Sequence, residues 1–259
     1  MKIATFNING VKARLPALLD WLKAATPDVV ALQEIKSVDE GFPRAEIEDL
    51  GYHVETHGQK GFNGVALLSR RPLEDVVRGL PGDDADEQAR WIEATVSGDG
   101  AAVRVCGLYL PNGNPAPGPK YDYKLAWMAR LEARARALLA EEAPAVMLGD
   151  YNVIPEARDV HDPAAWGQDA LYLPQTRAAF RRILHLGFTD AVRAFDAGEA
   201  YTFWDYQAGA WPKNHGIRID HALLTPQAAD RLRAAGVDRA VRGGDKPSDH
   251  VPVWLEIDL

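Results

Sequence analysis

Side chains that could hold a cation or move a proton recur along this sequence of 259 residues, each at or near the end of a predicted β-strand. They are Asn7, Glu34, Tyr109, Asp150, Asn152, Asp220, Asp249 and His250. Carboxylate and amide oxygens bind hard cations such as Mg²⁺, and a histidine can donate a hydrogen bond to a phosphate oxygen. This combination of residue types indicates metal-assisted hydrolysis of a phosphodiester.

Two of these positions also have an ordinary structural explanation. Glu34 ends an apolar strand, which favours a carboxylate in a cleft, but an edge glutamate paired with Lys36 would give the same pattern. Asp150 and Asn152 follow Gly149 and lie two residues apart, so both could face one side of an extended chain. The alternative is a polar turn, because Asp and Asn favour turns in any protein.

Asp220 lies in an otherwise apolar run, residues 219–224, where a carboxylate must find a partner. A structural salt bridge to Arg218 or Arg90 is one explanation. The other is a pair with His250, in which the carboxylate fixes the imidazole tautomer and stabilises its charged form.

The remaining candidates are weaker. Tyr109 could be a core tyrosine with a bonded hydroxyl, and Asp249 could cap a turn. The other histidines show no ligand spacing. Cys106 is the only cysteine and lies in an apolar run, which excludes a disulfide framework and a thiolate metal site.

Elements of secondary structure must bring these residues together. Strands are expected at residues 2–7, 29–32, 64–69, 91–96, 103–109, 145–148, 218–224, 237–241 and 251–257, and helices around residues 15–22, 125–142 and 180–184. In residues 91–96, Glu93 and Thr95 are expected on an exposed face. Because many strands are adjacent without a helix between them, we expect an α/β (α+β) fold of two packed sheets with helices outside.

Composition sets the limits of this interpretation. With 47% hydrophobic residues and no linker-like stretch, residues 1–259 are expected to form one domain. No apolar run spans a bilayer, and a cytoplasmic protein is expected. The net charge of −8 argues against DNA binding by bulk charge but allows a local basic rim. Residues 59–63, 111–119, 154–173 and 205–216 are expected to be binding loops.

Motifs in a fixed order resemble the exonuclease III family of apurinic/apyrimidinic (AP) endonucleases, within the endonuclease–exonuclease–phosphatase superfamily. They include Phe6-Asn7-Ile8-Asn9-Gly10, Leu32-Gln33-Glu34-Ile35-Lys36, Tyr109-Leu110-Pro111-Asn112-Gly113, Gly149-Asp150-Tyr151-Asn152, Gly216-Ile217-Arg218-Ile219-Asp220 and Lys246-Pro247-Ser248-Asp249-His250. The resemblance implies a four-layer α/β sandwich, in which two mixed sheets pack face to face with helices outside. It also implies Mg²⁺-dependent cleavage 5′ to abasic sites, with 3′–5′ exonuclease and 3′-end trimming of double-stranded DNA.

The resemblance also implies roles for residues. Glu34 would be the principal ligand of Mg²⁺, for which Mn²⁺ may substitute, and the full metal set would be Asn7, Glu34, Asp150, Asn152, Asp249 and His250. The catalytic set would be Tyr109, Asp150, Asn152, Asp220 and His250. DNA would be contacted by Lys12, Gly61, Phe62, Phe203 and Trp204. The expected partner is duplex DNA with abasic sites or blocked 3′ ends, bound by a monomer.

Departures from the family pattern leave alternatives open. Asn9 and Ile217 stand where some members have aspartate and tryptophan, and residues 113–120 lack an arginine that some members insert into DNA. The balance of endonuclease to exonuclease activity therefore stays open. Another superfamily branch, a non-specific deoxyribonuclease or a phosphoinositide or sphingolipid phosphoesterase, is the alternative enzyme. An inactive nucleic-acid-binding domain is the non-enzymatic one.

Overall fold

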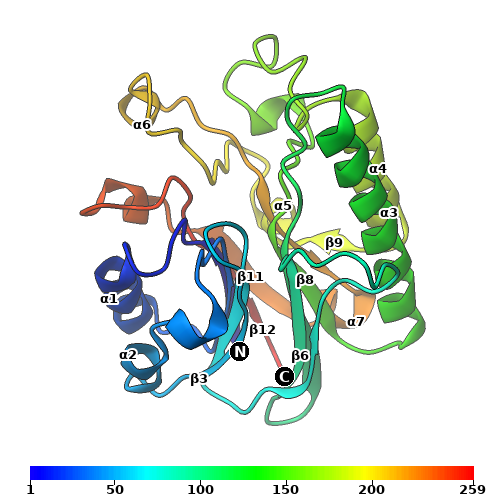
Figure 1. Cartoon of the computed structure of the whole chain (residues 1–259). Coiled ribbons are helices and arrows are strands. Elements are labelled where there is room, and N and C mark those ends of the chain that lie inside the picture. The colour runs from blue at the N-terminus through cyan, green and yellow to red at the C-terminus, as the bar shows by residue number, and fades with distance from the viewer.

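The computed structural model describes residues 1–259 and contains two six-stranded sheets packed face to face, with helices on the outside (Figure 1). The first sheet has the order β11-β12-β1-β2-β4-β3 and the second β5-β6-β7-β8-β10-β9. Only β1–β2 and β7–β8 pair in parallel, so both sheets are mixed. The expected fold class is confirmed.

The strands are β1 (Lys2–Asn7), β2 (Val29–Gln33), β3 (His53–His57), β4 (Val65–Ser69), β5 (Glu74–Arg78), β6 (Trp91–Ser97), β7 (Ala102–Tyr109), β8 (Ala145–Asp150), β9 (Thr189–Asp190), β10 (Asp220–Leu224), β11 (Leu232–Val237) and β12 (Val253–Ile257). The α-helices are α1 (Leu15–Ala25), α2 (Arg44–Glu48), α3 (Pro119–Ala140), α4 (Pro174–His185), α5 (Ala191–Phe195), α6 (Ala210–Lys213) and α7 (Pro226–Ala229). Short 3₁₀ helices are η1 (Asp39–Gly41), η2 (Ala157–Asp159) and η3 (Arg239–Gly243).

Buried side chains separate these elements into layers. One apolar cluster lies between the sheets and includes Ile3 and Val29 from one sheet and Val105 and Leu148 from the other. A second cluster joins the first sheet to α1 and α2, and a third joins the second sheet to α3 and α4. Central strands such as β2 and β8 are therefore buried on both faces, which explains their continuous apolar sequences.

Two features of the structure differ from expectation. The strand expected at residues 237–241 is wrong: β11 ends at Val237, and η3 follows. Ala and Gly in β11 have low strand propensity, so pairing with β12 rather than local preference fixes this strand. Glu93 was expected to be exposed but is buried, where it pairs with Arg104 and Arg134.

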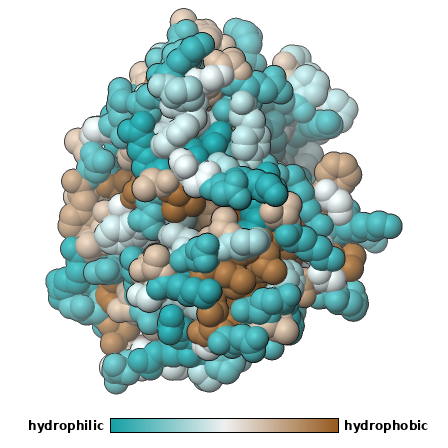
Figure 2. All heavy atoms as spheres, turned by 90° about the vertical axis from the view of Figure 1, so that its left-hand side faces the viewer, coloured by the Kyte–Doolittle hydropathy of each residue, from teal (hydrophilic) through white to brown (hydrophobic).

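The outer strands were missed for a related reason. The edge strands β3 and β5 are rich in charged residues and histidine, and such residues mask the apolar alternation of a strand while protecting a sheet edge. No helix combines the length and apolar character needed to cross a membrane. Figure 2 shows the face that carries α1 and α2, on which hydrophobic side chains gather in small groups among hydrophilic ones.

One end of the double sheet collects the polar residues singled out from the sequence. Asn7, Tyr109 and Asp150 are the last residues of β1, β7 and β8, Glu34 follows β2 directly, and Asp220 opens β10. The antiparallel register places Asp220 opposite Asp150. The long loops before α3, before α4 and around α6 extend beyond the sheets at this end, at the top of Figure 1.

Candidate active site

Two carboxylates, one from each sheet, meet at a single amide. Asn7 is fully buried, and its Nδ2 donates to Oε1 of Glu34 at 2.9 Å and to Oδ2 of Asp150 at 3.0 Å. Since β1 and β2 belong to the first sheet and β8 to the second, this amide spans the boundary between them. The two acids are thereby held close together with free oxygen lone pairs.

The backbone and charge around Glu34 favour its ionised form. Glu34 has a left-handed φ of 50°, and the amide of Ile35 donates to the carbonyl of Gly64, so the chain turns at the end of β2. Burial alone would raise the pKa of Glu34, but the hydrogen bond from Asn7 and the charges of Lys36 and His250 hold that pKa below its usual value. Glu34 thus forms a salt bridge with Lys36, at 3.0 Å between Nζ and Oε2, in addition to its hydrogen bond with Asn7.

His250 lies between two acids. Its Nδ1 bonds Oδ2 of Asp220 at 2.8 Å, and its Nε2 is 3.7 Å from Oδ2 of Asp150. Burial opposes a charged imidazole, but the carboxylates of Asp220 and Asp150 outweigh that effect and raise the pKa of His250 to about 10. Asp220 therefore partners His250 rather than Arg218 or Arg90.

Asp150 is less acidic than an ordinary aspartate. Burial, together with the negative charges of Asp220 and Glu34, raises its pKa to about 7, against the opposing charge of His250. A carboxylate with a pKa near neutrality can both hold and release a proton at physiological pH.

The segment that carries His250 is tied to β1. The Ser248 hydroxyl donates to the carbonyl of Asn7 at 2.7 Å and accepts from the amide of His250 at 3.2 Å. Beside it, Oδ1 of Asp249 accepts from Nδ2 of Asn9 at 3.0 Å. Hence Asp249 lies next to the acids, held there by Asn9.

Asn152 and Tyr109 complete the polar wall. Nδ2 of Asn152 donates to the carbonyl of Leu110 at 2.9 Å, and its Oδ1 accepts from Asn112 at 3.2 Å. Burial and the charges of Glu34 and Asp150 raise the pKa of Tyr109 well above its usual value, so its hydroxyl stays protonated. Both residues can donate a hydrogen bond into the site.

These residues border a cavity of about 200 Å³. Its polar side holds Glu34, Tyr109, Asn112, Asn114, Asp150, Asn152, Asp169, Asp205, Asp249 and His250, and its apolar side holds Trp166, Leu171, Phe203, Ile217 and Ile219. The ring of Phe203 lies 5.0 Å from that of His250, edge to face. The cavity thus combines charged groups and an apolar wall in a space of small-molecule size.

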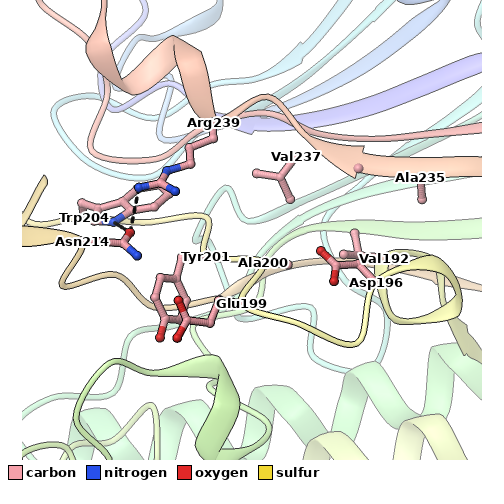
Figure 3. A pocket seen from close by; sticks show the side chains of 11 residues that line it. Val192, Asp196, Glu199, Ala200, Tyr201, Trp204, Asn214, Ala235, Val237 and Arg239 are labelled. Atoms are coloured by element: carbon pink, nitrogen blue, oxygen red, sulfur yellow. Dashed lines mark hydrogen bonds between the residues drawn. The ribbon is translucent and has the colours of Figure 1, made fainter.

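The two neighbouring aromatic residues face different cavities. Phe203 lines the acidic cavity, whereas Trp204 is buried and lines a separate cavity of about 220 Å³ with Tyr201, Asn214 and Arg239 (Figure 3). The indole of Trp204 donates to Oδ1 of Asn214 at 3.2 Å. In this arrangement Trp204 supports the wall that carries Phe203 and presents no surface to a molecule in the acidic cavity.

The other expected DNA-contacting residues lie outside the cavity. Lys12 and Gly61 are exposed, and Phe62 is 74% exposed on the loop between β3 and β4. An apolar ring so exposed to solvent is a candidate contact for a large partner.

The donor set fits a hard divalent cation. Ligand atoms of Glu34, Asp150 and His250 lie within 4.8 Å of one another. His250 is held as a cation by two acids, so the available donors are mainly oxygens, which suit Mg²⁺ or Mn²⁺ better than Zn²⁺. One buried oxygen, Oδ1 of Asp220, has no hydrogen-bond partner in the protein.

Several residues of the site escaped the sequence analysis. Asn112 was only part of a motif, and Asn114, Asp169 and Trp166 lie in loops without periodicity. Lys124 is different: it is fully buried on the apolar stripe of α3, three residues after Tyr121 and four before Met128. A lysine among the apolar residues of a helix could have been recognised in the sequence as a buried charge with a specific partner.

Comparisons with known proteins agree with this geometry. A family model described as the endonuclease/exonuclease/phosphatase family matches residues 4–250. The chain is 35% identical over 265 residues to exodeoxyribonuclease III of Haemophilus influenzae, and the match covers 99% of each protein.

Solved structures extend the similarity to the whole fold. An AP endonuclease from Archaeoglobus fulgidus matches with a TM-score of 0.94 and 38% identity over 100% of both chains. The 3′ phosphatase NExo from Neisseria, bound to a product DNA hairpin, matches with a TM-score of 0.95 and 38% identity, also over 100% of both chains. Relatives described by different reactions match equally well, so overall similarity does not select between those reactions.

Proposed function

The chain belongs to the endonuclease/exonuclease/phosphatase family, and on that premise we propose that it is a Mg²⁺-dependent DNA-repair nuclease of the exodeoxyribonuclease III type. We propose that it cuts 5′ to abasic sites and trims blocked 3′ ends of double-stranded DNA. The observation that carries the proposal is the cluster of Glu34, Asp150 and His250, with Asp220 behind the imidazole, beside an apolar wall.

The acids supply the cation site. Glu34 is the principal ligand in this proposal, because its carboxylate is held ionised by Asn7 and Lys36. Asp150 shares the site, and Asn7 and Asp249 stand beside it. When bound, Mg²⁺ would supply positive charge to the scissile phosphate. Mn²⁺ would substitute, since it accepts the same oxygen ligands.

Hydrogen-bond donors beside the acids hold the phosphate. A protonated His250, fixed through Nδ1 by Asp220, donates from Nε2 to a phosphate oxygen as negative charge grows there. The free hydrogen on Nδ2 of Asn152 and the hydroxyl of Tyr109 orient the same phosphate. Phosphoryl transfer depends mainly on positioning and charge stabilisation, which these groups provide.

Asp150 is the group placed to accept a proton. Its carboxylate lies beside Glu34 and 3.7 Å from Nε2 of His250, where it can take a proton from the attacking water. The Asp220–His250 pair is the alternative base, and the raised pKa of His250 makes it the weaker candidate because a cation cannot accept a proton.

The apolar wall favours a sugar without a base. Phe203, Ile217 and Leu171 offer carbon surface beside the phosphate donors, as the face of an abasic deoxyribose or a terminal 3′ nucleotide requires. In this proposal the protein acts as a monomer, since one chain provides every group that the reaction needs.

One assay tests the reaction and its balance. Duplexes of one sequence, carrying a single abasic site, a 3′-phosphate or neither, are incubated with the protein and Mg²⁺. We expect a nick 5′ to the abasic site and release of the 3′-phosphate, with slower trimming of the intact 3′ end. No turnover of any duplex, but hydrolysis of a phosphoinositide, would assign the chain to another branch. Trimming without nicking would remove the abasic-site activity from the proposal.

A further inference from the structure

A buried ammonium group lies directly behind the candidate active site. Lys124 projects from the second turn of α3 and is fully buried, and its Nζ donates to the carbonyls of Asn112 at 3.0 Å and Asn152 at 2.6 Å. It forms no salt bridge, although Asp150 and Asp169 act on it at longer range. The charge is therefore held by two backbone carbonyls that belong to two different loops.

Such an arrangement is costly for the fold. Burying an ammonium group away from water costs several kcal/mol unless its partners compensate, and burial lowers the pKa of Lys124 to about 7. An unbranched apolar side chain would fill the same space between Tyr121 and Met128 without that penalty. Stability alone does not explain a lysine at this position. Its hydrogen bonds to the carbonyls of Asn112 and Asn152 do explain it.

Both carbonyls belong to residues that form the polar wall of the cavity. Asn112 lies in the loop after β7 and Asn152 in the loop after β8, and the two side chains hydrogen-bond each other at 3.2 Å. Asn152 adopts a left-handed φ of 47°, a conformation that asparagine tolerates better than most residues, so the chain turns sharply at this position. Lys124 binds the backbone at both ends of this amide pair.

The loop is also shaped around the lysine. Gly113 has a φ of 90°, and a Cβ atom there would lie 2.6 Å from Cδ of Lys124. The absence of a side chain at position 113 thus makes room for the lysine stem. Lys124, Gly113 and the two asparagines form one unit, in which the helix fixes the separation of the two loops.

We propose that Lys124 is a positioning residue that sets the orientation of the Asn152 carboxamide by tying the loops after β7 and β8 to α3. It touches no substrate. This inference rests on the proposed function, because Asn152 is the group through which Lys124 acts. Loss of the ammonium group releases the Asn152 backbone and lets its amide turn away from the phosphate.

A double-mutant cycle tests this idea. Lys124→Met keeps the length of the stem and removes the donors, and we expect kcat to fall roughly 10- to 100-fold with little change in KM. Asn152→Ala removes the amide itself. If Lys124 acts through Asn152, adding Lys124→Met to Asn152→Ala lowers kcat by less than about threefold further, because the effects of coupled residues are not additive.

Two further variants separate positioning from folding. Leu138→Ala makes a cavity near the C-terminal end of the same helix, away from Lys124, and we expect lower thermal stability with an unchanged kcat. Lys124→Arg restores a donor and should recover part of the activity lost in Lys124→Met. If Lys124→Met keeps the parental kcat, or if its effect multiplies fully with that of Asn152→Ala, the inference is overturned. An inactive parent protein would instead contradict the proposed function.

Discussion

At the scale of single residues, the site depends on pairs of groups that control each other's charge. Asp220 and Asp150 keep His250 protonated, and His250 in turn limits how far the pKa of Asp150 rises. The pKa values of His250 and Asp150 are therefore both far from those of the free side chains. Replacing one changes the protonation of the others, which allows binding and chemistry to be separated by mutation.

Asp220→Asn tests the role of the imidazole. The amide still fills the space but no longer stabilises the charged imidazole, so we expect kcat to fall by roughly 10²- to 10⁴-fold with KM changed by less than about threefold. Steady-state cleavage of an abasic-site duplex measures both values. Asp230→Asn, at an exposed position after α7, is the matched control. Weaker DNA binding with an unchanged kcat would show that Asp220 has a binding or structural role.

Glu34→Gln tests the cation site. Removing one ionised oxygen ligand should raise the Mg²⁺ concentration needed for half-maximal cleavage by about 10-fold or more. Chelation should abolish cleavage by the parent protein, and Mg²⁺ or Mn²⁺ should restore it better than Zn²⁺. Glu74→Gln, on the exposed edge strand β5, is the control. Full activity in excess chelator would exclude a metal-dependent reaction.

At the scale of secondary-structure elements, the sequence predicted most of what is buried and little of what is at the edge. β1, β2, β7, β8 and α1 follow from apolar runs and helical spacing, because both faces of the central strands are covered. β3, β5 and β11 lack that pattern, since an edge strand needs pairing rather than burial. The site residues at strand ends were predictable because each lies at one end of such an apolar run.

The partners of those site residues were not predictable. That Asn7 bridges Glu34 and Asp150 depends on how the two sheets pack, and no local pattern records it. The direction of Trp204 was not predictable either, since adjacent aromatic residues in an extended segment point to opposite sides. That both Phe203 and Trp204 contact DNA stays a prediction.

β10 connects the site to a buried charge network that predicts pH-dependent stability. The guanidinium of Arg218 binds Asp159 and Asp190 and donates to Nδ1 of His221, whose Nε2 donates to the carbonyl of Val153 at 2.9 Å. Burial, reinforced by the positive charge of Arg218, lowers the pKa of His221 from 6.5 to about 4. The neutral ring is the form that satisfies both contacts.

The sign of the effect follows from this shift. Between pH 4 and 6.5 the unfolded protein binds more protons at His221 than the folded one, so stability is lost as the pH falls through that range. The loss approaches about 3 kcal/mol near pH 4. Urea denaturation between pH 7 and 4 measures it, and His221→Gln should flatten the dependence. An unchanged slope in that variant would assign the pH dependence to other groups.

At the scale of the whole molecule, the two sheets share one apolar interior, and β12 pairs with β1. We therefore expect residues 1–259 to unfold as one domain, in a single cooperative transition. Tryptophan fluorescence and far-ultraviolet circular dichroism should give coincident denaturation curves. Separate midpoints for the two signals would indicate two units.

The net charge of −8 means that any attraction to DNA is local. If Lys12 and the exposed loop bearing Gly61 and Phe62 form a DNA-binding rim, the logarithm of affinity should fall with that of salt concentration by ~0.9 per phosphate neutralised. Lys12→Ala should make this slope shallower by about one phosphate's share, on all duplexes alike. Lys23→Ala, on α1, is the control. An unchanged slope in Lys12→Ala would place Lys12 outside the rim.

The pairing of β12 with β1 also has a consequence for synthesis. The ribosome makes Asn7 and Glu34 early, yet His250 and the strand that holds its segment against β1 leave the exit tunnel among the last residues of this sequence. A nascent chain can pair β1 to β4 of the first sheet before that moment, but it lacks β12 and cannot assemble the pair of His250 with Asp220. We therefore expect cleavage activity to appear only after β12 has paired with β1.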